Sequence, residues 1–169
     1  CIYIIMVFKV IAQLRTNFFV KNLTFCPSPG PVKYSGYVTT ENTQQYLEFD
    51  INSPIPLDEK IDATIIIDSI LGNKTTVRLF EIHEKVFCKA MNKYLGELWY
   101  GIERAAQLPP GVCPIRASHY HVHHYHLDFS KMALQTFPFG ILKLSFYAKD
   151  KIKNQQVFCM IILVENIAN

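Results

Sequence analysis

The order of hydrophobic and polar positions predicts short β-strands over most of the chain. Residues 46–51 alternate, with Leu47, Phe49 and Ile51 on one face and the acidic side chains on the other. Further strands are expected at residues 16–25, 34–40, 60–71, 75–85, 118–129, 141–149 and 157–165. Proline-rich and glycine-rich segments separate these runs. Short strands divided by such turn-forming segments are typical of an antiparallel sandwich or cup.

The period changes to that of a helix between the strands expected at 75–85 and 118–129. Apolar residues from 88 to 107 recur three and four positions apart, which predicts one amphipathic helical insertion. Gly96 and Gly101 weaken it, so irregular turns are expected at one end. Glu97 and Glu103 are expected on the solvent-exposed face of this helix, and we do not expect them to form a catalytic pair.

The composition agrees with a folded, β-rich protein. The chain has 169 residues, of which half are hydrophobic and only 18% are charged, so intrinsic disorder is excluded. The net charge is +3 and the basic residues are scattered, which argues against a nucleic-acid partner. Aromatic residues make up 13% of the chain, which favours a β-rich core or an apolar cavity.

The first twelve residues are almost entirely apolar. This run is too short for a membrane-spanning helix and has the length of the apolar region of a signal peptide. We therefore predict that residues 1–12 are the remnant of a signal peptide, that 13–169 form a single domain, and that the protein is secreted. The alternative is that the run is the first strand of the fold.

The cysteines and two glycosylation sequons are compatible with secretion. Without Cys1 the cysteines form an even set without metal-binding or redox spacing: Cys26, Cys88, Cys113 and Cys159. Such a set suits two disulfides in an oxidising compartment, with three connectivities open, although four buried thiols of a cytosolic protein are the alternative. Asn22 and Asn73 begin Asn-x-Thr sequons, so glycosylation is expected there.

Several short motifs occur in an order that resembles a known family. Residues 21–24 precede a proline-rich exit, and residues 47–50 precede the proline-leucine break at 54–57. Cys88 and Cys113-Pro114, followed by Tyr120, bracket the helical insertion, and Cys159 lies in the closing hairpin. Over residues 16–165 this order resembles the ML (MD-2-related lipid-recognition) family, in particular its ganglioside-activator-like branch and secreted chemosensory proteins of insects.

The resemblance implies a secreted, immunoglobulin-like β-cup that holds a lipid in a hydrophobic cavity, without chemistry and without a cofactor. We predict the disulfides Cys26–Cys159, between first and last strands, and Cys88–Cys113, across the helical insertion. Apolar character and strand parity select the cavity residues Phe49, Ile51, Ile65, Ile67, Tyr94, Leu95, Leu98, Trp99, Ile102, Phe137, Phe139, Leu144, Phe146 and Ile161. The polar head of the ligand is expected near residues 95–102, beside Tyr94, Tyr100 and Glu97. A cavity of at least about 300 Å³ is expected, unless these side chains pack as an ordinary core.

The strand expected at 118–129 carries five of the six histidines. His119, His121 and His123 alternate and would share a face, a spacing that can ligate zinc or copper, whereas His124 and His126 would share the other face with Tyr120 and Val122. A solvent-exposed polar strand is the interpretation we prefer over this metal site, and a pH sensor is a third.

The sequence does not favour an enzyme. It has no Gly-x-Ser-x-Gly elbow, no phosphate-binding loop and no His-Glu-x-x-His motif. The predicted function is therefore a secreted lipid carrier, whose partners are a lipid and also a membrane surface or a receptor. The alternatives are a β-sandwich that docks a protein and a metal-binding protein with a His-rich strand.

Overall fold

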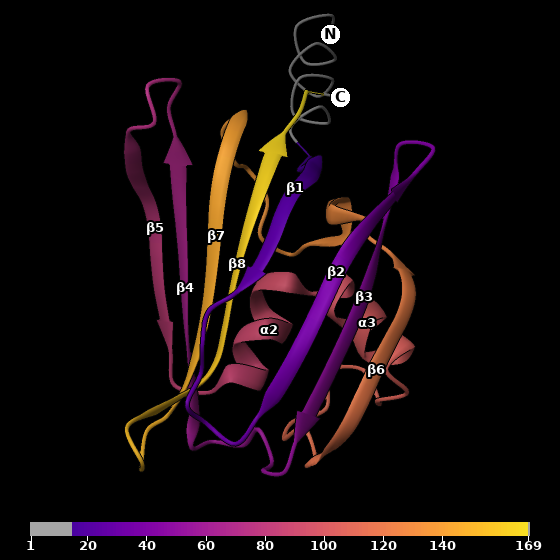
Figure 1. The fold of residues 1–169 in the computed structure, drawn as a ribbon, viewed down its shortest axis with the longest axis vertical. Coiled ribbons are helices and arrows are strands. Elements are labelled where there is room, and N and C mark those ends of the chain that lie inside the picture. The colour runs from indigo at the N-terminus through magenta and orange to yellow at the C-terminus, as the bar shows by residue number, and fades with distance from the viewer. Residues whose placement is uncertain (1–14, 169) are drawn as a thin grey trace, which may run out of the picture.

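The computed structural model describes residues 15–168 as two antiparallel β-sheets with a helical insertion (Figure 1). One sheet has the strand order β1-β8-β7-β4-β5, and the other has the order β2-β3-β6. The strands are β1 (Phe18–Phe25), β2 (Lys33–Glu41), β3 (Gln44–Ser53), β4 (Ile61–Ile70), β5 (Thr76–Glu84), β6 (Ser118–His126), β7 (Gly140–Asp150) and β8 (Gln155–Asn166). The prediction of a mainly β sandwich with a helical insertion is confirmed. The predicted signal segment lies outside the described residues, and its boundary with the domain stays a prediction.

Alternation of side chains explains why the two sheets face each other. On β4, Ile61, Ala63, Ile65 and Ile67 are buried at every second position. Cross-strand neighbours continue this apolar face, because Ile65 is opposite Phe146 on β7. The main driving force for this arrangement is the burial of both apolar faces against each other, which removes them from water.

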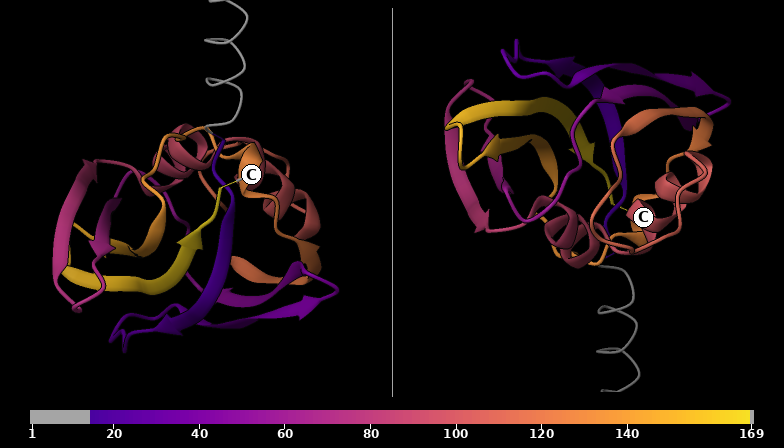
Figure 2. Two further views of the ribbon diagram at one scale, coloured as in Figure 1. Left: turned by 90° about the horizontal axis from the view of Figure 1, so that it is seen from above. Right: turned by 90° about the horizontal axis from the view of Figure 1, so that it is seen from below.

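The helical insertion consists of two helices, α2 (Phe87–Leu95) and α3 (Glu97–Ala105). The sequence predicts one helix with irregular turns at one end instead. The break falls at Gly96, whose φ of +53° lies in the left-handed region that favours glycine. A Cβ at this position would lie 3.0 Å from the Cβ of Ala133, so the close approach also requires glycine. A 3₁₀ turn, η1 (Phe129–Lys131), follows β6. Both helices lie on the side of the molecule away from β2 (Figure 2), and among residues 15–168 no helix is long and apolar enough to cross a membrane.

Both disulfides join the pairs that the sequence predicts. Cys26 is bonded to Cys159 with their Cα atoms 5.3 Å apart, and Cys88 is bonded to Cys113 with their Cα atoms 5.9 Å apart. The first bond ties the end of β1 to β8. The second ties the start of α2 to the segment that leads into β6, so it holds the helical insertion against the sheets.

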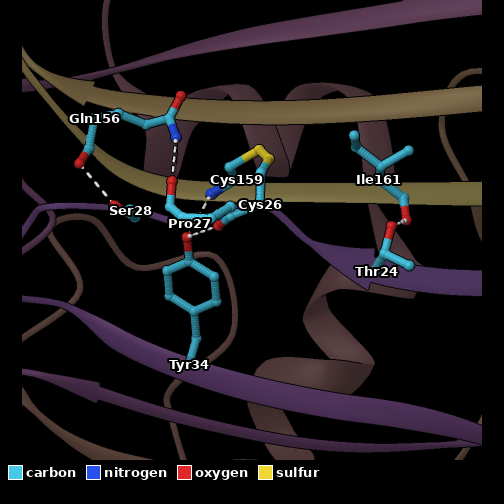
Figure 3. Close-up of a disulfide and its surroundings, with 8 residues drawn as sticks. All are labelled: Thr24, Cys26, Pro27, Ser28, Tyr34, Gln156, Cys159 and Ile161. Atoms are coloured by element: carbon cyan, nitrogen blue, oxygen red, sulfur yellow. Dashed lines mark hydrogen bonds between the residues drawn. A yellow bond between two sulfur atoms is a disulfide. The ribbon is translucent and has the colours of Figure 1, made fainter.

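Two polar side chains connect the sheets along their β1–β2 side. Near one end, Gln45 of β3 accepts the main-chain N–H of Val20 at 2.7 Å and donates to its carbonyl at 2.9 Å, as a neighbouring strand would. Near the other end, the Tyr34 hydroxyl of β2 donates to the Cys26 carbonyl at 3.3 Å and accepts the Cys159 N–H at 3.0 Å (Figure 3). The sheets are therefore fixed to each other along this side.

We predict that Tyr34→Phe lowers the free energy of unfolding by about 1–3 kcal/mol, because the buried Cys159 N–H loses its acceptor. Tyr37→Phe is the matched control, since Tyr37 lies on the same strand but is 58% exposed. Urea unfolding of the two variants measures the difference. Equal stabilities would show that the Tyr34 hydroxyl does not hold the sheets together.

Candidate functional site

An apolar cavity lies between the two sheets and is closed on a third side by the helices. Leu47, Phe49 and Ile51 of β3 form one wall. The opposite wall comes from the five-stranded sheet and includes Leu144, Phe146, Phe158, Met160 and Ile162. Helices α2 and α3 contribute Met91, Leu95, Leu98, Trp99 and Ile102. Residues far apart in the sequence thus converge on one apolar space.

Three polar side chains at the cavity wall have hydrogen-bond partners within the protein. The Ser53 hydroxyl donates to the Ile55 carbonyl at 2.6 Å, and the Tyr120 hydroxyl donates to the Arg116 carbonyl at 2.6 Å. The carboxylate of Glu103 accepts the Gly111 N–H at 2.6 Å. Two polar atoms of the wall without such a partner, Trp99 Nε1 and Glu103 Oε1, are buried. The surface presented to a ligand is therefore hydrocarbon.

The cavity is smaller than the sequence-based expectation. Its volume is about 190 Å³, whereas the expected minimum was about 300 Å³, the lower end for ordinary ligand pockets. The difference has a structural cause: α2 packs onto β4 and occupies part of the space between the sheets. The helical insertion therefore lines the cavity and also limits its size.

The structure places eight of the fourteen predicted residues around the cavity. These eight lie on β3, β7 and the helices: Phe49, Ile51, Leu95, Leu98, Trp99, Ile102, Leu144 and Phe146. Strand alternation identified those on strands, and helical spacing identified those on the insertion. Their contact with a ligand stays a prediction.

The other six predicted residues lie outside the cavity. Ile65 and Ile67 are buried on β4, the strand that α2 covers. Phe137 packs on Phe18, with ring centroids 5.1 Å apart. Phe139 is 56% exposed, so it cannot line an interior wall. Met160 and Ile162 of β8 line the cavity, and Ile161 between them is on the other face of the strand.

Tyr94, the sixth, and Glu97 do not line the cavity. The Tyr94 hydroxyl donates to Glu84 at 2.6 Å, and this bond, together with Lys93, holds the pKa of Glu84 below its usual value. Exposed Glu97 pairs with Arg104 at 3.3 Å. Both groups are already engaged in bonds within the protein, and their contact with the polar head of a ligand stays a prediction.

Glu103 lies at the cavity wall, not on the solvent-exposed face of the helix. It follows Trp99 by one helical turn and is only 2% exposed. Its Oε1 atom and the Trp99 Nε1 atom are buried without a regular hydrogen bond. Burial raises the pKa of Glu103, and the Gly111 N–H, the Trp99 indole and Arg104 oppose this rise only in part. The sequence signal for this position was its place on the apolar stripe of α3.

We predict that Glu103→Gln removes a pH-dependent loss of stability. The native carboxyl group has a pKa above the ordinary 4.5, so the native state holds the proton to higher pH than the unfolded state. The stability of the unmutated protein should therefore fall as the pH rises from about 4.5 through the native pKa, and stay lower above it.

Denaturant unfolding from pH 4 to 8 measures this effect as the difference between the two proteins. The Gln variant should gain relative stability across the window, whereas the control Glu97→Gln should not, because Glu97 is exposed. Parallel pH profiles for Glu103→Gln and the unmutated protein would contradict the proposed burial penalty.

The His-rich strand differs from the sequence prediction in one important way. A β-bulge lies between β3 and β6, where Leu47 pairs with Tyr125 but Phe49 pairs with Val122. His124, at φ +47°, supplies the extra residue and reverses the parity. His124 and His126 are therefore exposed with the alternating histidines, and do not share the inner face with Tyr120 and Val122.

Carboxylates of β3 lie beside these histidines. His119 Nε2 contacts both oxygens of Asp50, the longer contact being 2.6 Å. Glu48 Oε1 accepts the His124 N–H at 2.8 Å, and His123 Nδ1 lies 3.0 Å from the same oxygen. Partial burial acts to raise the pKa of Glu48, but these two contacts outweigh it and lower the pKa, so this carboxyl group is ionised at neutral pH.

The two sequon asparagines are both exposed. Asn22 lies on β1 at a bulge, and Asn73 lies in the turn between β4 and β5. Exposure is what an attached glycan requires, and glycosylation at these positions stays a prediction.

Comparison with known proteins finds similarity only among solved structures. No protein-family model matches the chain, and no curated protein matches it. Among solved structures, the chain is similar to chicken MD-1 complexed with lipid IVa, with 10% sequence identity and a TM-score of 0.40. The likeness covers 91% of this chain and 99% of that one. We draw no conclusion about the function of this chain from a likeness of that degree.

Proposed function

We propose that this protein is a secreted, non-enzymatic carrier that holds the apolar part of a lipid between its two sheets. The observation that carries the proposal is the cavity itself, with hydrocarbon walls from both sheets and from both helices. An apolar cavity has no favourable interactions to offer water, and it binds apolar molecules instead. The polar groups of Ser53 and Tyr120 bond within the protein, so recognition of the ligand here relies on shape and burial.

The volume of the cavity favours a ligand with a single chain. About 190 Å³ is too little for the several chains of a large glycolipid, and the whole chain of a fatty acid or a lysolipid enters only if the walls move apart. Met91, Met132 and Met160 are at the wall, and flexible methionine side chains adapt to ligands of different shape. The walls therefore allow modest expansion when the chain enters.

Burial alone provides enough free energy for such binding. Each methylene group transferred from water contributes roughly 0.8 kcal/mol, so a chain of about 14 carbons contributes on the order of 11 kcal/mol before costs. Association and ordering of the chain remove much of this. Micromolar affinity is then expected without a charged anchor.

The two disulfides and the exposed sequons support the secreted part of the proposal. Disulfides persist in oxidising compartments. The structure has two of them, Cys26–Cys159 and Cys88–Cys113, and each joins segments that are distant in the sequence. Asn22 and Asn73 are accessible to the glycosylation machinery of the secretory route.

We predict that a saturating single-chain lipid raises the melting temperature, because a ligand that binds only the folded state stabilises it. Trp99 is the only tryptophan and lines the cavity, so a fluorescent fatty acid should quench its emission. Trp99→Ala should weaken binding by more than about 1 kcal/mol, because a large apolar contact is lost.

Neighbouring isoleucines of β8 provide the matched controls. Ile162 faces the cavity, whereas Ile161 is on the other face of the strand. Ile162→Phe should fill the space and weaken lipid binding, and Ile161→Phe should leave binding unchanged. Absence of any melting shift or quenching with fatty acids, lysophospholipids and glycolipids would overturn the proposal and favour a protein-docking sandwich.

A further inference from the structure

A cluster of two histidines and one carboxylate lies on the outer face of the three-stranded sheet, whose inner face lines the cavity. One ligand atom from each of Glu48, His121 and His123 lies within 4.8 Å of the other two. We propose that these three side chains bind a Zn²⁺ ion, with water as the remaining ligand. Two imidazoles and a carboxylate, completed by water, form a common set for zinc in proteins.

The strand register brings the three residues together. His121 and His123 are two positions apart on β6, so both side chains point to solvent, and their nearly parallel rings have centroids 6.3 Å apart. Glu48 of β3 reaches between them. Its carboxylate oxygens lie 4.0 Å from His121 Nε2 and 3.0 Å from His123 Nδ1.

These separations are close to those of a metal centre. Ligand atoms about 2.1 Å from a tetrahedral zinc ion are about 3.4 Å from each other. The two histidine side chains are 61% and 78% exposed, so their rings are free to close the difference by small rotations. Little of the surrounding structure needs to move.

The bulge at His124 fixes the carboxylate of the proposed site. The His124 N–H donates to Glu48 Oε1 at 2.8 Å, and the Glu48 side chain is only 15% exposed. A positive φ is uncommon for a residue other than glycine, and bulges commonly re-aim side chains at functional sites. A carboxylate oriented by a main-chain donor is the kind of support that metal ligands receive from surrounding groups.

Neighbouring residues favour a cation without competing for it. Asp50 and Glu41 lie on the same face, the first in contact with His119 and the second 3.8 Å from His124. Because His119 is engaged by Asp50, it does not complete the triad that the sequence suggests. Imidazole ligands select zinc-like ions, and they disfavour Ca²⁺ and Mg²⁺.

Calorimetric titration of the full, disulfide-bonded chain with zinc chloride tests the proposal. We expect saturable binding of one ion, weakened at least tenfold in each of the variants His121→Gln, His123→Gln and Glu48→Gln. His126→Gln and His83→Gln are controls, because both lie outside the cluster, and they should bind as the unmutated protein does. Calcium and magnesium chloride should give no saturable signal.

Three results would overturn the proposed site. One is no saturable binding up to about 1 mM zinc. Another is unchanged affinity in His121→Gln and His123→Gln while their circular dichroism matches the unmutated protein. The third is a loss of zinc affinity in His119→Gln as large as that in His123→Gln, combined with unchanged affinity in Glu48→Gln. That result would make His119, not Glu48, the third ligand. Lipid binding should persist in every variant, because these side chains point away from the cavity.

Discussion

The connection of the two sheets along one side is the constraint on which the interior depends. Gln45 bonds to the main chain of Val20, and Tyr34 bonds to the main chain at both cysteines of the first disulfide. These bonds fix how closely the sheets approach at β1 and β2. On the other side the helices separate the sheets instead of allowing them to close. An apolar space remains between the sheets because hydrogen bonds hold them together along the β1–β2 side, while the helices fill the opposite side only in part.

The pleat of β3 and β6 gives the same two strands two different surfaces. Phe49 and Ile51 face the cavity, while Glu48 and Asp50 on the same strand face the histidines of β6. The bulge at His124 extends the polar surface without disturbing the inner one, because Tyr125 returns to the apolar side. Changes to one surface can therefore be made without altering the other.

Alternation and spacing made the strands and much of the cavity predictable. Leu47, Phe49 and Ile51 were identified on one face because a strand has a period of two. Two features depend on single backbone events that periodicity does not encode, the break at Gly96 and the bulge at His124. A third depends on one side chain, the amide of Gln45 that bonds to the main chain of Val20. Glu103 was misassigned because a charged residue on an apolar stripe is normally found at its edge, whereas here Gly111 provides an internal donor. Phe139 and Ile161 were misassigned because apolar character alone does not determine which face of a strand or turn is covered.

The central claim is that the space between the sheets holds one lipid chain. Native mass spectrometry of the disulfide-bonded protein, expressed through a secretory route and sprayed without detergent, tests it most directly. The account predicts a population carrying one single-chain lipid per protein, and a reduced population for Ile162→Phe but not for Ile161→Phe. Protein that is free of lipid as purified and stays free after incubation with fatty acids and lysolipids would contradict the claim.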